Sequence, residues 1–253
     1  MRFDDLDSKM RAFESARDPA ALPEVYLVAR IDGRSFTRLT KEVMQFERPF
    51  DITFRDHMIA TVEHLMESGF RPLYGFTESD EISLLFARDA DAFGRNIRKW
   101  TSVLAGEASA AFSARLGKPA AFDCRVIELP TPELVVDYFR WRSEDAHRNA
   151  LNAWCYWQLR DNGVSAADAT SRIEGMSIAA KNELLFGMGI NFNDLPAWQK
   201  RGIGIYRETY EKRATNPLTG AEVTATRQRL RVDFDLPIRD EYNAFVRERL
   251  RTP

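Results

Sequence analysis

The sequence has few of the side chains that carry nucleophilic or acid–base catalysis, with only three histidines and two cysteines in 253 residues. Cys124 and Cys155 form no C-x-x-C motif, which favours free thiols over a disulfide or a metal site. His57 and His64 lie in one segment of helical periodicity, where structural roles are expected. No G-x-S-x-G, H-E-x-x-H, Walker or G-x-G-x-x-G motif occurs. The chain therefore does not match Ser–His hydrolases, zinc proteases or Walker-type ATPases.

Long apolar runs and an excess of one charge are also missing. No apolar run approaches the ~18 residues of a membrane span, and residues 1–18 are charged and lack the apolar core of a signal peptide. We therefore expect a cytoplasmic protein. The formal net charge is −2, which argues against a generic polyanion binder.

Positive charge is concentrated near the C-terminus. Residues 198–253 hold 12 lysines and arginines against 8 aspartates and glutamates. Arg227, Arg229 and Arg231 alternate and would share one face of a strand. This face is either simply solvated or a contact surface for the phosphates of a nucleic acid.

The apolar patterns predict an α+β fold whose core has the order β-α-β-β-α-β, which is the split pattern of a ferredoxin-like sheet. Residues 25–32 are almost continuously apolar, as in a strand buried on both faces. Asp51 is a possible N-cap of the first helix, and Gly69 and Gly117 are expected to stop the two helices. The expected elements are strands at 25–32, 70–76, 81–87 and 121–129 and helices at 51–69 and 91–117.

After Pro130 the pattern becomes helical and then loop-rich. It ends in an expected hairpin whose turn is the segment 216–220, rich in proline and glycine. We therefore predict a catalytic domain at residues 1–130. Residues 131–253 would form a helical extension with a C-terminal hairpin, packed on that domain.

Two acidic segments occur at the ends of predicted strands. Asp32 ends the first strand, and Asp80 lies between the second and third strands with Glu78 and Glu81 beside it. The first and third strands are neighbours in a ferredoxin-like sheet, so Asp32 and Asp80 should lie close together. The acidic turn is either a solvated turn or a binding site for Mg²⁺, which prefers oxygen ligands and commonly bridges carboxylates and phosphates.

The residues that follow Asp32 suggest a phosphate-binding turn. Gly33 permits close backbone approach, and the N–H groups of residues 34–37 could surround a triphosphate. A plain turn is the alternative, but the acidic turn at the matching strand end favours a site for metal and triphosphate. Lys181, in the segment "AAKNELLF", either faces a phosphate or belongs to a capping or turn motif.

From residue 26 to residue 206, the chain resembles the tRNA-histidine guanylyltransferase family, which includes the Thg1-like 3′–5′ polymerases. The stretches that carry the resemblance are "ARIDGRSFTRLT", "YGFTESDEISLLF", "FDCRVIELP", "DYFRWRSEDAHRNALN", "AAKNELLFGMGINFN" and "WQKRGIGIY".

The resemblance implies a core similar to a polymerase palm and an enzyme that adds nucleotides to the 5′ end of tRNA. In this family a 5′-monophosphate is activated, usually with ATP, and the 3′-hydroxyl of GTP then attacks the activated phosphate. The resemblance thus implies Mg²⁺ as cofactor, GTP and ATP as substrates, tRNA as partner and a homotetramer.

The resemblance also implies roles for individual residues. Asp32 and Asp80 match the metal-binding carboxylates, and Gly33 matches a position that offers its carbonyl to a metal ion. Ser79 and Glu81 flank the second carboxylate, and we expect Glu81 to share in catalysis. The triphosphate-binding turn is matched by Arg34, Ser35, Phe36 and Thr37.

Other positions match less completely. Arg48 stands where the family often has a lysine, with Lys41 upstream, and either could assist activation. Asp51 matches a position that contacts the guanine base, which competes with its expected capping role. His147 and Asn149 match positions expected to bind tRNA, and we add Arg227, Arg229 and Arg231 to that surface.

The segment 147–153 departs from the eukaryotic members. They carry His-Ile-Asn-Asn-Leu-Tyr-Asn where this chain has "HRNALNA", so Ala150 and Ala153 replace asparagines. Alanine offers no polar contact. Either the alanines are packing substitutions, or the chain depends less on one tRNA and adds templated nucleotides. Two rival classes are a non-catalytic ferredoxin-like RNA-binding module and a nucleotide cyclase of the palm type.

Overall fold

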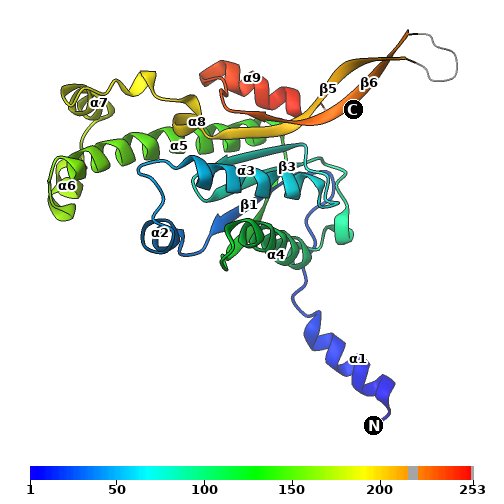
Figure 1. Ribbon diagram of the computed structural model, residues 1–253. Coiled ribbons are helices and arrows are strands. Elements are labelled where there is room, and N and C mark those ends of the chain that lie inside the picture. The colour runs from blue at the N-terminus through cyan, green and yellow to red at the C-terminus, as the bar shows by residue number, and fades with distance from the viewer. Residues whose placement is uncertain (216–221, 252–253) are drawn as a thin grey trace.

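The structure is a computed structural model and describes residues 1–215 and 222–251. Its centre is one antiparallel sheet with helices on both faces (Figure 1). The strand order is β4-β1-β3-β2-β5-β6. The strands are β1 (Tyr26–Gly33), β2 (Tyr74–Glu78), β3 (Glu81–Phe86), β4 (Phe122–Leu129), β5 (Ile203–Thr215) and β6 (Glu222–Asp233). The covering helices are α3 (Ile52–Glu67), α4 (Ile97–Leu116), α5 (Pro132–Asp161) and α9 (Arg239–Arg249).

Strand β1 lies inside the sheet, and its apolar side chains point to both faces. Leu27, Ala29 and Ile31 pack in one core with residues of α3 and α4. Tyr26 and Val28 pack in a second core with residues of α5 and α9. The almost unbroken apolar run of β1 is thus explained by helices covering both faces.

The predicted β-α-β-β-α-β core is confirmed as β1-α3-β2-β3-α4-β4, and β1 pairs with β3 as expected. Gly117 ends α4 in the left-handed conformation, with φ 72°. Gly75 allows α3 to pack against β2, because a Cβ atom there would lie 2.6 Å from Cγ1 of Val62. The α+β class and its ferredoxin-like arrangement therefore agree with the sequence patterns.

Two element boundaries differ from the prediction by more than two residues. Strand β2 begins at Tyr74 rather than at residue 70, after Arg71, whose φ is 55°. Helix α4 begins at Ile97 rather than at residue 91, because Phe93 takes a left-handed conformation and Asn96 then caps the helix. Phe93 is therefore 57% exposed and does not belong to the apolar stripe of α4.

The C-terminal half contributes to the same sheet. The expected hairpin is present as β5 and β6, and β5 pairs with β2 at the side away from β3. The outer part of this hairpin extends beyond the body of the molecule (Figure 1). The predicted turn at 216–220 lies outside the described residues. The segments between α5 and β5 are α6 (Ala166–Ile173), α7 (Ile178–Gly187), η3 (Phe192–Asp194) and α8 (Ala197–Arg201).

Several helical elements in the N-terminal half were not expected from the sequence. Helix α1 (Phe3–Glu14) precedes the sheet, and α2 (Phe36–Arg38) continues into a π-helical turn, η1 (Leu39–Val43). A 3₁₀ turn, η2 (Ala92–Arg95), precedes α4. No helix within residues 1–215 and 222–251 is long and apolar enough to cross a bilayer.

Candidate active site

The turn between β2 and β3 carries the acidic cluster. Ser79 and Asp80 form the turn itself, and Ser79 has a φ of 48°. Glu78 and Glu81 face each other across the two strands, and Glu81 is also the register partner of Asp32 on β1. The backbone N–H of Gly33 donates to the carbonyl oxygen of Asp80 at 3.1 Å. The structure thus brings the ends of β1 and the β2–β3 turn together, as the fold prediction required.

Asp32 and Asp80 form a carboxylate pair. Burial raises the pKa of Asp80, and the negative charge of Asp32 adds to the rise, while hydrogen bonds from the backbone and from Ser79 oppose it. No lysine, arginine or histidine of the described residues forms an ion pair with either carboxylate. No group of three potential metal ligands was found in the described part of the chain. Two carboxylates suit Mg²⁺, which often completes its shell with water and phosphate.

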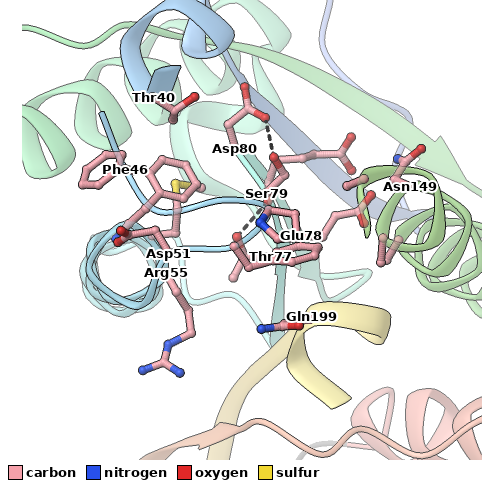
Figure 2. Close-up of a pocket in the computed structure, with 18 of the residues that line it drawn as sticks. Thr40, Phe46, Asp51, Arg55, Thr77, Glu78, Ser79, Asp80, Asn149 and Gln199 are labelled. Atoms are coloured by element: carbon pink, nitrogen blue, oxygen red, sulfur yellow. Dashed lines mark hydrogen bonds between the residues drawn. The ribbon is translucent and has the colours of Figure 1, made fainter. Parts of the chain in front are cut away.

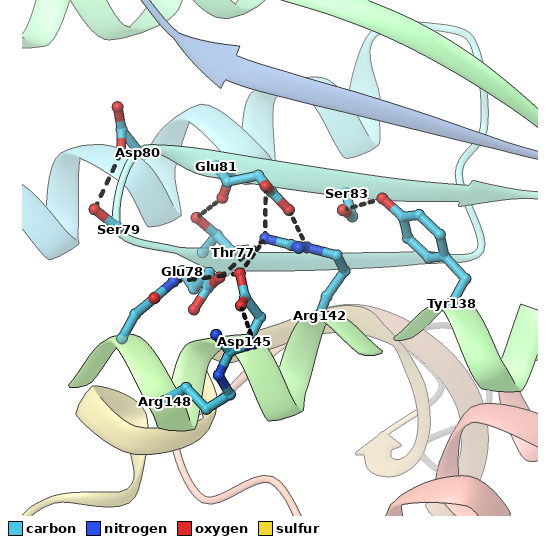
Figure 3. A network of polar contacts seen from close by, with 11 residues as sticks. Thr77, Glu78, Ser79, Asp80, Glu81, Ser83, Tyr138, Arg142, Asp145 and Arg148 are labelled. Atoms are coloured by element: carbon cyan, nitrogen blue, oxygen red, sulfur yellow. Dashed lines mark hydrogen bonds and ion pairs between the residues drawn. The ribbon is translucent and has the colours of Figure 1, made fainter. Parts of the chain in front are cut away.

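Arg142 of α5 neutralises the other two acidic side chains (Figure 3). Its Nε donates to Oε1 of Glu81 at 2.6 Å, and its Nη2 donates to Oε2 of Glu81 at 2.8 Å. The same Nη2 also donates to Glu78 at 3.2 Å and forms an ion pair with Asp145 at 3.3 Å. The Arg142 side chain is buried, with the residue 5% exposed.

This network corrects part of the sequence interpretation. A metal ion was expected to compensate the whole acidic turn, but Glu78 and Glu81 are compensated by an arginine 64 and 61 residues away. Burial nevertheless raises the pKa of Glu78 to about 8; Arg142 opposes this rise, and the neighbouring carboxylates add to it. Figure 3 shows Asp80 directed away from Arg142. Within this cluster, Asp32 and Asp80 are therefore the two carboxylates with no basic partner among the described residues.

A cavity of about 410 Å³ opens beside this pair (Figure 2). Its walls come from the β2–β3 turn, the segment before α3, helix α5 and helix α8. Of the residues predicted for the site, Asp32, Arg48, Asp51, Ser79, Asp80, Glu81 and Asn149 line it. A space of this size is typical of a small-molecule site.

One wall of the cavity is cationic. The Arg48 guanidinium lies 4.4 Å from the ring centre of Trp157, and the Lys41 ammonium lies 5.6 Å from the same centre. The two basic residues considered for assisting activation therefore lie together on one aromatic ring, which holds them by cation–π attraction. Anionic groups such as phosphates would be attracted to this wall.

Asp51 performs the capping role that competed with base recognition. Its Oδ1 accepts from the N–H of Phe54 at 2.8 Å, and its Oδ2 accepts from the N–H of Glu47 at 2.8 Å. Both oxygens are thus used by the backbone at the start of α3. The side chain also lines the cavity, so a contact with a base stays a prediction.

The turn predicted to bind a triphosphate, residues 34–37, does not line the cavity beside Asp32 and Asp80. The N–H of Arg34 donates to the carbonyl of Ala121 at 2.8 Å and cannot also face a phosphate. Arg34 and Ser35 line a second hollow of about 370 Å³, which shares no lining residue with the first. The Phe36 ring is buried, and a Cβ atom at Gly33 would lie 2.5 Å from it, so this position needs glycine. Thr37 lines neither space.

Lys181 and His147 also lie away from the cavity lining. Lys181 lies within α7, where Ser177 is the N-cap, so the alternative of a capping or turn motif at Lys181 does not hold, and a contact with phosphate stays a prediction. The His147 ring packs edge-on against Phe192 at 5.3 Å, and burial lowers its pKa. Asn149 does reach the cavity and donates to Asp145 at 3.3 Å.

The alternating arginines lie on β6, and two of them already have partners. Arg229 donates from Nε to Glu208 of β5 at 2.6 Å, and Arg231 donates to the same carboxylate at 3.2 Å. These hydrogen bonds lower the pKa of Glu208. Arg227 stands opposite Tyr210 in the strand register. The surface is therefore less positive than the sequence suggested.

Sequence reasoning missed Arg142 and Trp157. Arg142 occupies a position on the buried side of α5, in line with Val135, Phe139 and Ala146. A charged residue within an apolar helical stripe was the available signal, because such a residue needs a buried partner of opposite charge.

The comparisons with known proteins agree with this geometry. A family model described as "tRNAHis guanylyltransferase" matches residues 7–130, and one described as "Thg1 C terminal domain" matches residues 133–236. A probable tRNA(His) guanylyltransferase of Drosophila melanogaster is 32% identical, over 79% of this chain and 72% of the relative. One of Dictyostelium discoideum is 30% identical, over 90% of this chain and 91% of the relative.

Solved structures are also similar. A bacterial Thg1-like protein in complex with GTP has a TM-score of 0.74 at 27% identity, covering 98% of this chain and 100% of that one. The tRNA(His) guanylyltransferase of Saccharomyces cerevisiae has a TM-score of 0.72 at 27% identity, covering 77% and 90%.

The α+β fold, the carboxylate pair and the cationic wall of the cavity agree with these relatives. The protein therefore belongs to the class of nucleotidyltransferases, which are enzymes that transfer nucleotides. More specifically, the chain belongs to the tRNAHis guanylyltransferase family, because the two family models together match most of its length.

We predict that Arg142→Met destabilises the fold because it leaves Glu78 and Glu81 buried without a cation. The free energy of unfolding should fall by about 3–5 kcal/mol, measured by urea denaturation at neutral pH. The matched control is Arg140→Met, which breaks an exposed ion pair with Glu144 on the same helix. An equal loss in both variants would mean that the buried network does not stabilise the turn.

Proposed function

We propose that this enzyme adds nucleotides to the 5′ end of tRNA in the 3′–5′ direction, with nucleoside triphosphates as substrates. The observation that carries the proposal is the Asp32–Asp80 pair, which has no basic partner among the described residues and borders a cavity with a basic wall. Support comes from the bacterial Thg1-like neighbours, whose structures are complexes with GTP and with ATP. The names of the relatives support tRNA as the acceptor.

The chemistry has two steps. In the first, the 5′-monophosphate of the tRNA attacks the α-phosphorus of ATP or GTP, and pyrophosphate leaves. In the second, the 3′-hydroxyl of an incoming GTP attacks the activated 5′-phosphate, and the nucleoside monophosphate leaves. Both steps require positioning and charge neutralisation rather than a covalent protein intermediate, which suits a chain with few histidines and cysteines.

The carboxylates of Asp32 and Asp80, with the carbonyl of Gly33, are the groups that would hold Mg²⁺, and two ions are expected. Bound there, Mg²⁺ supplies positive charge to the triphosphate and lowers the pKa of the attacking hydroxyl. Arg48 and Lys41 would orient phosphates from the opposite wall. Glu81 positions the turn through Arg142, and Ser79 hydrogen-bonds the Asp80 carboxylate.

The proposal also covers the domains, the location, the oligomeric state and the tRNA contacts of the protein. We propose that residues 1–130 form the catalytic domain and residues 131–253 its extension. A cytoplasmic location and a homotetramer are part of the same proposal, on the basis of composition and family resemblance. His147, Asn149 and the β6 arginines are proposed to contact tRNA, and Lys181 to contribute from α7.

We expect Asp32→Asn and Asp80→Asn each to reduce transfer by several orders of magnitude, because each removes a negative ligand needed for Mg²⁺. The assay incubates the enzyme with labelled GTP, Mg²⁺ and tRNA, and it resolves elongated tRNA from cyclised nucleotide. Folding should survive, since removing one of two adjacent carboxylates relieves repulsion. Asp137→Asn, an exposed carboxylate on α5, is the matched control.

The outcome decides between the candidate functions. Near wild-type elongation in either variant, at saturating Mg²⁺, contradicts the role of the pair. Cyclised nucleotide from the wild-type enzyme would instead indicate a cyclase. Binding of tRNA without any product would indicate an RNA-binding module.

Replacing Arg227, Arg229 and Arg231 with glutamine should weaken tRNA binding and leave GTP binding unchanged. The slope of log affinity against log salt should fall by about 0.7–0.9 for each phosphate that the protein no longer neutralises. Because Arg229 and Arg231 share Glu208, Arg227→Gln alone should account for a large part of the effect. An unchanged affinity and salt slope in the triple variant would mean that the strand face is only solvated.

We expect templated repair of several 5′-truncated tRNAs rather than strict use of one tRNA. Ala150 and Ala153 both line the cavity, and as alanines they offer no amide there; Ala150 also packs in an apolar cluster, as the packing alternative requires. The measurement compares kcat/KM for a truncated non-histidine tRNA with a paired addition and a histidine tRNA with an unpaired one. A clear preference for the second, lost when its anticodon is changed, would contradict this expectation.

A further inference from the structure

Helix α1 has an apolar face that no other described part of the chain covers. None of the residues of α1 is buried, and the helix stands away from the body of the molecule (Figure 1). Phe3 is 78% exposed, Phe13 is 71% exposed and Met10 is 55% exposed, and Leu6 is exposed as well. A helix of about 12 residues is only marginally stable alone in water. Its apolar face therefore needs a partner.

The spacing of these four residues fits pairing with another helix. They follow one another at intervals of three, four and three residues, which are the a and d positions of a heptad repeat. Phe3 and Met10 occupy the a positions, and Leu6 and Phe13 occupy the d positions. This narrow stripe is the seam of a two-helix contact rather than the broad face of a helix that packs on a globular core.

The charges beside the stripe identify the partner. The g positions hold Arg2, which is the N-cap residue just before α1, and Lys9, and the e positions hold Asp7 and Glu14. Within one chain Asp7 also accepts from Nε of Arg11 at 2.6 Å. In a parallel pair each g residue faces the e residue five positions later on the other chain. Arg2 would then face Asp7 of a second copy, and Lys9 would face Glu14, so every such pair joins opposite charges. An antiparallel pair would bring like charges together.

From this pattern we propose that α1 is an interaction surface for a second copy of this chain, with the two α1 helices parallel and in register. Charge argues against two other partners. Residues 3–14 contain four acidic and two basic side chains, so RNA phosphates and anionic membranes would be repelled.

The connection to the body gives this contact a consequence for the assembly. The chain is fixed to the body soon after α1, because Asp18 forms an ion pair with Arg98 at 3.0 Å and Ala20 bridges to Asn96. Only residues 15–17 separate α1 from this attachment. Pairing of α1 would therefore bring the starts of the two α4 helices close to each other.

A disulfide test measures both contact and orientation. In full-length protein carrying Cys124→Ser, Leu6→Cys places a thiol at a d position, where it should meet its own copy in a parallel pair. Ser8→Cys places a thiol on the outer side of the same helix and is the matched control. Under mild oxidation the first variant should form covalent dimers about tenfold faster. Equal rates would overturn the proposal.

A charge test then examines the partner choice by sedimentation. Two double variants are compared, Arg2→Glu with Lys9→Glu and Asp7→Lys with Glu14→Lys. Each should weaken self-association, because the g and e positions of the two helices then carry like charges and repel. An equimolar mixture of the two variants should recover association, since the g positions of one variant then face e positions of opposite charge on the other. Association unchanged in both variants, or no recovery on mixing, would overturn pairing through α1. Both tests are independent of catalysis, so their failure would leave the proposed nucleotide transfer intact.

Discussion

The Arg142 guanidinium is the interaction on which the geometry of the candidate site depends. Four carboxylates meet where β1 ends and β2 turns into β3, and their mutual repulsion would open the turn without a positive charge. Arg142 binds the two glutamates that flank the turn, one on each strand. Asp80, at the tip, is thereby held near Asp32, while its own carboxylate has no basic partner in the described part of the chain.

This arrangement divides the acidic cluster into two parts with different physical roles. Glu78 and Glu81 are structural, because both accept hydrogen bonds from Arg142 within the fold. Asp32 and Asp80 have no basic partner among the described residues, so a bound cation can take that place. The position of Asp80 in the turn contributes to the division: Glu78 and Glu81 are register partners that both reach Arg142 of α5, whereas Asp80 lies between the two strands and is directed away from Arg142 (Figure 3). A buried ion pair of this kind adds little net stability, but it fixes the direction of the side chains around it.

Much of the core and the central pair could be predicted from the sequence, because both depend on local patterns. The apolar periods predict the order of strands and helices, and that order alone places β1 beside β3. Arg142 could not be placed in this way, since its partner depends on how α5 packs across the sheet. The same is true of Glu208, which pairs with two arginines that looked free in the sequence. The start of α4 was missed because left-handed residues before it are not visible in an apolar pattern.

The β5–β6 hairpin continues the same sheet that carries the candidate site, so its position relative to the site is set by strand pairing. Thr77, just before the acidic turn, is the register partner of Ile203, the first residue of β5. From there the 13 residues of β5 span roughly 40 Å at about 3.3 Å per residue. Backbone hydrogen bonds, rather than a linker, therefore set the distance between the acidic turn and the outer hairpin. For the proposed tRNA substrate, the length of this hairpin would set how far from the cavity a second contact can be made.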